Sequence, residues 1–348
     1  MVNNLPSDQY DITVQSIYDV GDLSQELAPS IHYQSIVKTK NMLSFQLAAY
    51  FVRRIISPKV IADLFIKSGY DIENAYLEGE STRLIASHVS QSRKIAWVHV
   101  NMNEIFTSQG LYRSIDEHKA IYKKFSKVIC VSEGARRGFF QRFGEMENVE
   151  VLYNVIDGQL IHKKAEEHVE YQRRDGLNLL MVGNFRKEKA YDRMLSVSKK
   201  LNNEGYSFHL TILGSGAEFN SISALREELD LSQVVDMPGS IRNPYPYMKQ
   251  ADLLVCSSKE EAFSTVVIEA CILGLPTLTT DCAGMDEILD KGKYGMIVEN
   301  SVEGLYQGLK TVLEDPSVIA KYRAVLPERI SYFSKEKRIQ ETILMLEG

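Results

Sequence analysis

Short apolar runs of strand length recur along the whole chain, and segments with helical spacing of apolar residues lie between them. We expect strands at 12–17, 95–100, 128–131, 149–153, 177–182, 208–213, 253–256 and 277–279. We expect helices at 191–201, 222–229, 266–273 and 302–313. This alternation predicts parallel sheets with helices on both faces, and the run 177–182, which is apolar except for Asn178, is typical of a strand buried on both sides.

The charged segment 162–176 is the best place for a domain boundary in this chain. We expect a first domain at 1–165, completed by a C-terminal helix at 334–348, and a second domain at 166–333. Each should be a Rossmann-like, doubly wound α/β domain, and the two should face each other across a cleft. Ligands of such sheets bind at the carboxyl ends of the strands, so we look for chemistry in the loops that follow them.

Composition narrows the class of function. A net charge of −6 with 25% charged and 44% hydrophobic residues is typical of a soluble globular protein, and we expect no nucleic-acid partner. None of the four cysteines lies in a Cys-x-x-Cys pair, so we expect no metal site. The chain shows neither a signal peptide nor an apolar run long enough to cross a bilayer, which predicts a cytoplasmic protein.

The first candidate site follows the expected strand 253–256. Glu261 ends the loop and Glu269 lies about one turn into the next helix, so both carboxylates can face one cleft. The amides of Ser264 and Thr265 lie at that helix N-terminus, where an anion binds readily. Together these groups suit a sugar and a phosphate. The alternative is that Ser264 only caps the helix and Glu269 is only a solvated side chain.

Two further candidates follow the strands 177–182 and 208–213. Arg186 and Lys189 lie near the start of a helix, where cations oppose the helix dipole, so a bound diphosphate would offset their charge. A solvated basic turn is the alternative. The run Gly214-Ser215-Gly216 is a weak dinucleotide signal because Phe219 replaces the third glycine, which favours a tight turn. A fourth candidate, His99, ends the expected strand 95–100, where a structural histidine is the alternative.

Together, these segments resemble the signature of family 4 retaining glycosyltransferases of the GT-B fold. The resemblance covers about 177–346 and rests on the segments 183–192, 214–216, 243–248, 261–270 and 274–277. In the first domain, the segments 70–79, 94–99 and 127–157 are similar to members that build bacterial capsules and other surface polysaccharides. The ordered set is more specific than any one of its motifs.

The resemblance implies a role for each candidate. Glu269 would hold the ribose hydroxyls, Glu261 would contact the donor sugar, and His99 would line the acceptor side. The segment 241–245 would lie beside the base. The implied catalytic residues are Glu261, Lys189, Arg186 and His99. The implied donor-binding residues are Glu269, Gly183, Asn184, Gly214, Arg242, Ala262, Phe263, Ser264, Thr265 and Val266. Asn184 and Ala262 depart from the family, which often has arginine and glycine at these positions.

The implied reaction moves a hexose-type sugar from a nucleotide sugar, with a UDP-sugar as the expected donor, to a lipid-linked saccharide with retention. It uses no cofactor or metal, and the chain contains no Asp-x-Asp. Members of the family begin with a strand and a Gly-rich loop, which we expect to be missing here. One alternative is therefore a truncated, non-catalytic nucleotide-binding or partner subunit of a glycosyltransferase. A nicotinamide dehydrogenase, a sugar epimerase and a phosphorylase are minor alternatives.

The segment 42–67 interleaves basic with aromatic and aliphatic residues. This segment contains four basic residues and a single acid, Asp63; the basic residues are Arg53, Arg54, Lys59 and Lys67. A second basic group consists of Arg136, Arg137 and Arg142. Each basic residue near an anionic membrane surface contributes about 1 kcal/mol. We therefore expect salt-sensitive, peripheral contact with the inner face of the cell membrane. The alternative is a core helix with solvated charges.

Overall fold

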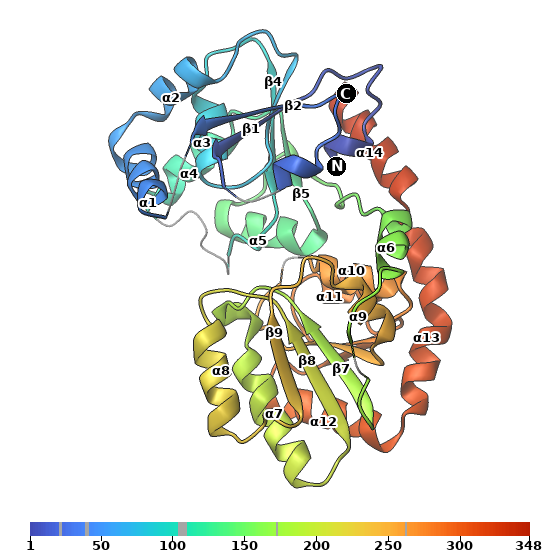
Figure 1. Cartoon of the computed structure of the whole chain (residues 1–348). Helices are drawn as coiled ribbons and strands as arrows, with labels where there is room; N and C mark the ends of the chain where they lie inside the picture. Colours follow the sequence, from blue (N-terminus) through green and yellow to red (C-terminus); the bar gives the residue numbers. More distant parts are fainter. Residues whose placement is uncertain (21–22, 39–41, 104–109, 172, 262) are drawn as a thin grey trace. The chain divides into compact units, whose positions relative to one another are not determined.

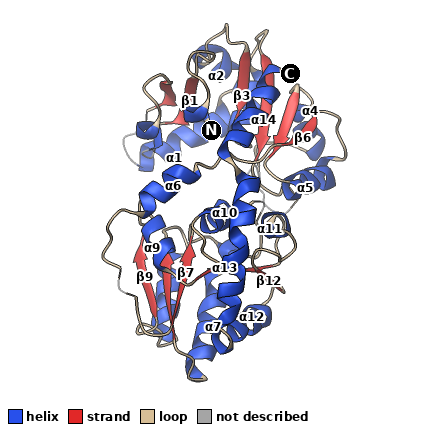
Figure 2. Ribbon diagram, turned by 90° about the vertical axis from the view of Figure 1, so that its right-hand side faces the viewer, coloured by secondary structure: helices blue, strands red, loops and turns tan. Residues whose placement is uncertain are grey.

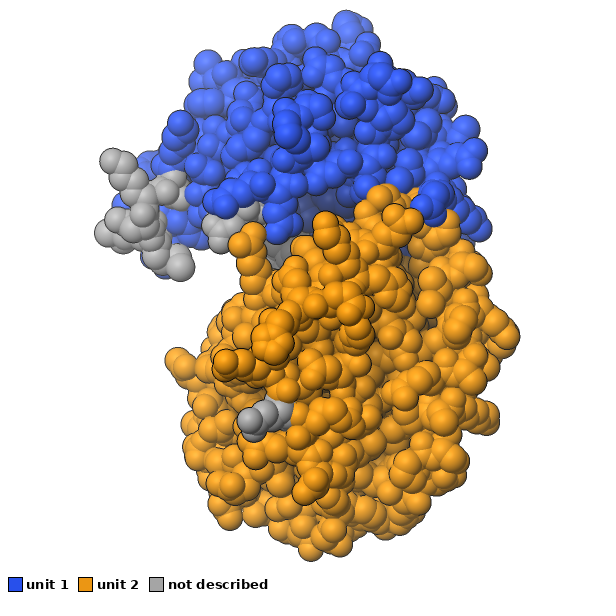
Figure 3. Space-filling view, turned by 45° about the vertical axis from the view of Figure 1, so that its right-hand side comes forward, with its two compact units in different colours: residues 1–155, 336–348 blue, residues 156–335 orange. Residues whose placement is uncertain are grey.

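The computed structural model describes residues 1–20, 23–38, 42–103, 110–171, 173–261 and 263–348. The chain divides into two compact units, Met1–Val155 with Glu336–Gly348, and Ile156–Lys335 (Figure 3). The division falls before the charged segment 162–176 because helix α6 (Gly158–Ala165) packs against α9 and α10 of the second unit. Each unit is described by itself below.

The second unit is built on one parallel six-stranded sheet. Its strands are β7 (Leu177–Val182), β8 (Phe208–Leu213), β9 (Val235–Gly239), β10 (Leu253–Cys256), β11 (Thr277–Thr280) and β12 (Met296–Val298). Their spatial order is β12-β11-β10-β7-β8-β9. Figure 1 labels the neighbouring strands β7, β8 and β9. This is the doubly wound order, in which the direction of strand addition reverses between β7 and β10. The carboxyl ends of β7 and β10 therefore mark the expected ligand site.

Helices lie on both sides of this sheet (Figure 2). They are α7 (Tyr191–Asn203), α8 (Phe219–Glu228), α9 (Tyr245–Gln250), α10 (Thr265–Ile272), α11 (Met285–Leu289), α12 (Val302–Glu314) and α13 (Ser317–Ile330). Helices α7 and α12 pack against each other, and α10 packs against α6 and α13. Strands β7 and β8 are almost wholly buried, as the predominance of apolar residues in both strands predicts. The buried polar residues of these strands are Asn178 of β7 and His209 and Thr211 of β8. Backbone groups of Arg174 and Gly176 satisfy the amide of Asn178.

The first unit contains a parallel four-stranded sheet and a separate parallel pair. The sheet has the order β3 (Ile72–Ala75), β4 (Arg93–Val98), β5 (Lys127–Cys130) and β6 (Val149–Val151), and the pair joins β1 (Thr13–Tyr18) to β2 (His32–Val37). The helices are α1 (Met42–Tyr50), α2 (Pro58–Phe65), α3 (Glu80–Ser87), α4 (Ile115–Tyr122) and α5 (Glu133–Phe143). All the strands and helices expected from the apolar pattern are present, with ends that differ by a few residues.

The C-terminal helix α14 (Lys335–Glu347) packs against the first unit. Arg93 of β4 donates hydrogen bonds to the backbone oxygens of Met345 and Leu346, each at 2.6 Å. The buried guanidinium of Arg338 lies over the ring of Tyr153, 4.6 Å from its centroid. Both ends of the chain thus belong to the same unit.

Candidate functional site

The loops that follow β7 and β10 are joined to each other at the carboxyl edge of the second unit's sheet. The hydroxyl of Ser257 donates to the backbone oxygen of Lys189 at 2.8 Å. The amide of Lys259 donates to the backbone oxygen of Glu188 at 2.7 Å. Because β7 and β10 are neighbours in the sheet, these bonds make one surface from two segments that are distant in the sequence.

Lys189 and Glu261 form an ion pair on this surface. The Glu261 carboxylate also accepts a hydrogen bond from the Ser258 hydroxyl at 2.9 Å. Only 26% of the Lys189 side chain and 12% of the Glu261 side chain is exposed, so neither is a freely solvated charge. Arg186 differs, because 64% of its side chain is exposed and its guanidinium lies 3.8 Å from Glu188. The structure therefore brings Lys189 and Glu261 together and leaves Arg186 outside this pair.

Glu269 lies on the second turn of α10 and faces α9. Among the described residues, its carboxylate receives one hydrogen bond, from the Tyr245 hydroxyl at 3.4 Å. Burial raises the pKa of Glu269 to about 7, and the bond from Tyr245 opposes this only in part. A carboxylate has about four acceptor positions, so most of its hydrogen-bonding capacity remains for a ligand. Two adjacent hydroxyl groups of a ligand could donate hydrogen bonds to these free positions of the Glu269 carboxylate.

The N-terminus of α10 offers backbone amides. Ser264 occupies the N-cap position, but its side chain makes no capping hydrogen bond. The first amides of a helix have no partner within the helix, and together with the helix dipole they attract an anion. The Phe263 ring is buried and lies 6.4 Å from the ring of Phe333, so Phe263 can contribute its backbone but not its ring to such a site. Thr265 is exposed and Val266 is half-buried.

The glycine-rich turn after β8 packs directly on the loop after β7. A Cβ atom on Gly214 would lie 1.9 Å from the backbone oxygen of Gly183, and one on Gly216 would lie 2.6 Å from that of Phe185. No side chain fits at either position. The glycines therefore allow two backbones to approach closely, which is the tight-turn interpretation of this motif. Asn184 is exposed on the same loop.

Three predicted site residues lie apart from this surface or outside the description. Ala262 is outside the described residues. Arg242 is exposed in the connection between β9 and α9. His99 belongs to the first unit, where it directly follows β4 and burial lowers its pKa to about 4.

Sequence reasoning missed Ser258 and Glu78. Ser258 orients Glu261, and only the folded loop reveals that contact. Glu78 accepts hydrogen bonds from the backbone amides of His99 and Val100 at the carboxyl edge of the first unit's sheet. The signal that could have identified Glu78 is its position shortly after a strand. The sequence of β3 conceals that strand, because its polar residues Glu73 and Asn74 are not typical of a buried strand.

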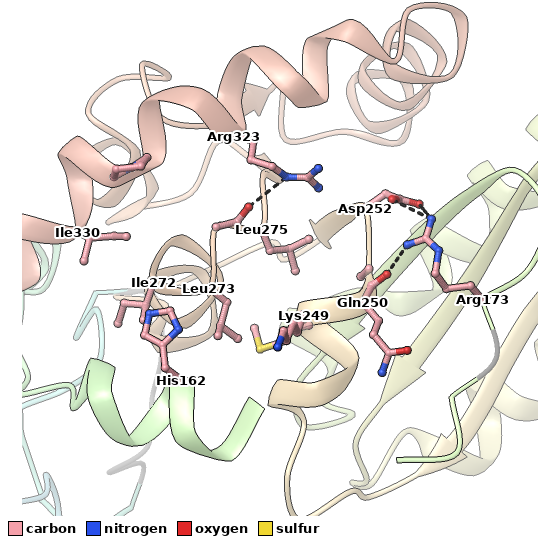
Figure 4. A pocket seen from close by; sticks show the side chains of 14 residues that line it. His162, Arg173, Lys249, Gln250, Asp252, Ile272, Leu273, Leu275, Arg323 and Ile330 are labelled. Carbon is pink, nitrogen blue, oxygen red and sulfur yellow. Dashed lines mark hydrogen bonds and ion pairs between the residues drawn. The ribbon is translucent and has the colours of Figure 1, made fainter. Parts of the chain in front are cut away.

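A hollow of about 620 Å³ lies elsewhere in the second unit (Figure 4). It is lined by the turns that precede β10 and β11, including Asp252 and Leu275, and so lies at the amino-terminal edge of the sheet. Arg173 donates to both carboxylate oxygens of Asp252, at 2.8 and 3.0 Å, and Lys249 pairs with Glu166. The hollow contributes no residue to the candidate site.

Within the described part of the chain, no group of three or more His, Cys, Asp or Glu side chains is placed to hold a metal ion. None of the four cysteines, all of which lie in the described ranges, forms a disulfide bond. Cys130, Cys271 and Cys282 are buried, and Cys256 is partly buried. The groups that the structure brings together at the candidate site are the Lys189–Glu261 pair, the Glu269 carboxylate, hydroxyls and the first backbone amides of α10.

Residues 163–332 match the protein family described as "Glycosyl transferases group 1". This match covers the unit that carries Lys189, Glu261 and Glu269. A relative from Campylobacter jejuni is the N-acetylgalactosamine-N,N'-diacetylbacillosaminyl-diphospho-undecaprenol 4-alpha-N-acetylgalactosaminyltransferase. It is 27% identical to this chain, over 79% of this chain and 72% of its own length.

Solved structures show the same fold. HepE from Anabaena, crystallised with UDP and glucose, matches with a TM-score of 0.73 at 17% identity, over 97% of this chain and 91% of its own. TarM matches with a TM-score of 0.65 at 20% identity over 79% of this chain, which spans only 54% of the length of TarM. The two Rossmann-like units thus have the GT-B architecture. The fold and the family match together indicate that this chain is similar to glycosyltransferases of the GT-B fold.

Proposed function

We propose that this protein is a retaining glycosyltransferase that moves a hexose-type sugar from a nucleotide sugar to a lipid-linked saccharide. The observation that carries the proposal is the cluster at the carboxyl ends of β7 and β10, where Lys189 and Glu261 meet beside the N-terminus of α10. Doubly wound sheets bind nucleotides at this switch point. The family match covers the same residues.

Each group in the cluster suits one part of a nucleotide sugar. The half-buried Glu269 carboxylate would accept hydrogen bonds from the ribose hydroxyls. Lys189 and the first amides of α10 would neutralise the diphosphate as the sugar–oxygen bond breaks, and donors aimed at developing charge are usually the largest contribution to catalysis. Glu261, held by Lys189 and Ser258, would hydrogen-bond the sugar. A diphosphate oxygen would then take the proton of the acceptor hydroxyl.

The choice of donor and acceptor rests on the relatives. HepE was crystallised with UDP, and the Campylobacter enzyme is named for transfer to a diphospho-undecaprenol-linked saccharide. We therefore place this protein in cell-surface polysaccharide synthesis with a UDP-sugar donor and a lipid-linked acceptor. Glycosyl transfer itself is supported by both the family match and the fold.

Calorimetry with UDP, GDP and their common sugar conjugates tests the nucleotide assignment, and a transfer assay with the best donor tests the activity. We expect UDP to bind and Glu269→Ala to weaken its binding more than the exposed Glu228→Gln does. Glu261→Ala should lower turnover more than UDP affinity. Binding of no nucleotide would refute the proposal. Binding without transfer to any lipid-linked saccharide would favour the non-catalytic subunit.

A lipid-linked acceptor also requires access to a membrane, and the first unit has a surface that fits one. The α1–α2 surface consists of the exposed apolar residues Leu47, Tyr50, Phe51, Ile55, Ile56, Val60, Leu64 and Phe65 with the basic residues Arg53, Arg54, Lys59 and Lys67. Monomeric soluble proteins rarely expose so many large apolar side chains in one short segment. We propose that it rests on the anionic inner face of the cell membrane.

Charge pairing reduces the basic character of the α1–α2 surface. Arg53 pairs with Glu80, and Lys59 pairs with Asp63. The exposed apolar residues therefore provide much of the attraction, with the basic residues adding the part that salt screens. None of the helices in the described ranges has the length and apolar character needed to cross a bilayer.

A further inference from the structure

The N-terminus of α10 lacks the usual capping contact. Ser264 occupies the N-cap position, but its side chain makes no capping hydrogen bond. The first backbone bond of the helix, from the Ile268 amide to the Ser264 oxygen, is long at 3.4 Å. A serine at the N-cap normally bonds an amide of the first turn and so holds that turn in place. The direction in which the first amides of α10 point therefore depends on other contacts.

Phe263, the residue before the N-cap, supplies such a contact. A hydrophobic residue at this position often packs against another apolar side chain and fixes the angle at which the chain enters the helix. The Phe263 ring is buried and lies 6.4 Å from the ring of Phe333 at an interplanar angle of 62°, which is an edge-to-face pair. Phe333 ends the short 3₁₀ helix η5 (Ser331–Phe333). A side chain from the C-terminal part of the second unit thus packs at the entrance of α10.

Phe333 is itself held firmly by its neighbours. It is buried, and its ring meets the ring of Tyr332 edge to face at 5.2 Å. The buried guanidinium of Arg329, on the last turn of α13, lies 5.0 Å from the centroid of the Phe333 ring and 4.1 Å from that of Tyr332. Arg329 also donates to the backbone oxygens of Ile288, at 2.7 Å, and Glu287, both on α11. Arg329 therefore ties the Phe333 ring to α11.

The same segment is anchored once more before the chain leaves the second unit, which it does after Lys335. Lys335 pairs with Asp157, the N-cap residue of α6, at 2.5 Å. We call residues 329–335 the brace, because they contact α11 through Arg329, the entrance of α10 through Phe333 and the start of α6 through Lys335. Helix α6 packs on α10 as well. The brace therefore holds α10 together with two of its neighbouring helices.

We propose that Phe333 is a positioning residue for the diphosphate of the donor and acts through Phe263. The Phe333 ring fixes Phe263, and Phe263 fixes the direction of the first amides of α10. This inference rests on the proposed function, in which those amides neutralise the diphosphate. Hydrogen bonds weaken steeply when the donor is misaligned, so a small rotation of the helix start lowers diphosphate binding. Glu269 lies one turn further along α10, so its contact with the ribose is not affected by that rotation.

A purely structural role for Phe333 predicts a different result. Truncating any buried phenylalanine leaves a cavity and lowers stability, but it does not discriminate between ligands with and without phosphate. Phe208 is the matched control, because 4% of Phe208 and 5% of Phe333 is exposed. Phe208 begins β8 and packs in a core cluster with Leu201 of α7 and Leu309 of α12. It therefore lies at the amino-terminal edge of the sheet, away from the entrance of α10.

The experiment compares the Kd for UDP, measured by calorimetry, with the Kd for uridine, measured by NMR titration, in the full-length protein. Phe333→Ala should raise the Kd for UDP by about 10-fold and leave the Kd for uridine unchanged, because uridine carries no phosphate. Phe333→Leu keeps much of the apolar volume and should recover part of the UDP affinity. Phe208→Ala should lower the unfolding temperature and leave both Kd values unchanged.

An unchanged ratio of the two Kd values in Phe333→Ala would overturn the proposal. An equal change of this ratio in Phe208→Ala would overturn it too, because the effect would then follow from lost stability. If Phe333→Ala does not fold, Phe333→Leu carries the test, and an unchanged ratio in that variant would have the same meaning.

Amide hydrogen exchange of the nucleotide-free protein separates this inference from the proposed function. Phe333→Ala should speed exchange of the Ile268 and Glu269 amides, which close the first turns of α10, whereas Phe208→Ala should not. Faster exchange in a protein that binds no UDP would contradict the proposed function and leave the positioning of α10 by Phe333 standing. UDP binding with an unchanged ratio of the two Kd values would contradict this inference and leave the donor site standing.

Discussion

Replacing Glu269 with glutamine should stabilise the protein and weaken nucleotide binding. In the folded protein burial raises the pKa of Glu269 from 4.5 to about 7. A raised carboxyl pKa means that the folded state favours the neutral form, so stability is lost as pH rises from 4.5 through 7. This difference in pKa corresponds to about 3 kcal/mol, which sets an upper limit on the loss at pH 8.

Glutamine has nearly the same shape and cannot ionise. Glu269→Gln should therefore raise the free energy of unfolding at pH 8 by up to about 3 kcal/mol and leave it almost unchanged near pH 4.5. The Tyr245 hydroxyl can still donate to the amide oxygen, so little is lost from the weak bond at 3.4 Å. The Kd for UDP should rise by about 10–100-fold, because the ribose hydroxyls lose a charged acceptor.

Urea unfolding at pH 4.5 and pH 8, with calorimetry of UDP binding at pH 8, measures both effects. The exposed Glu228→Gln is the matched control and should change neither quantity. Opposite effects on stability and binding are the mark of a group retained for its ligand. A Glu269→Gln variant that is less stable at pH 8 would show that burial does not oppose ionisation at this site. Unchanged UDP affinity would remove the ribose assignment.

Lys189→Met should lower the transfer rate by about 10²–10³-fold through loss of charge at the leaving group, whereas exposed Lys187→Met on the same loop should have little effect. Equal rates for the two variants would reduce the basic loop to a solvated turn. Gly214→Ala should destabilise the protein by about 1–3 kcal/mol in thermal unfolding, since its Cβ would meet the neighbouring backbone at 1.9 Å, and an unchanged midpoint would contradict that close approach. The double substitution Arg53→Glu with Arg54→Glu should reduce co-sedimentation of the protein with anionic vesicles at low salt. If the wild type does not bind these vesicles at low salt, or if the double variant binds as well as the wild type, the basic residues do not contribute to membrane contact.

The loop residues of the second unit could be predicted because their signals are local. An apolar strand, a loop with Glu261 and a helix with Glu269 follow one another within a short stretch. Their contacts could not be predicted. Lys189 and Glu261 were each expected to meet the donor, but their ion pair depends on β10 lying beside β7 although β8 and β9 intervene in the sequence.

Strand β3 shows the opposite case, in which the local pattern conceals the element. Its Glu73 is buried, and one carboxylate oxygen, Oε1, lies 2.8 Å from Nδ1 of His88. His88 follows α3 in the sequence, whereas β3 precedes it. A polar residue in a buried strand is stable only with such a partner, and the partner is visible only after folding. Because β3 was not recognised, Glu78 at its carboxyl end was missed as well.

The sequence alone determined the parallel α/β class, most strands and helices, and the loops in which candidate chemistry lies, because periodicity and turn residues act over a few neighbouring positions. Tertiary structure decided the strand order, the division after Val155 and the pairing of Lys189 with Glu261. It also decided the raised pKa of Glu269 and the unpartnered nitrogens of His99. These properties depend on desolvation and contact by residues far away in the chain, and no local pattern encodes which groups will be buried together.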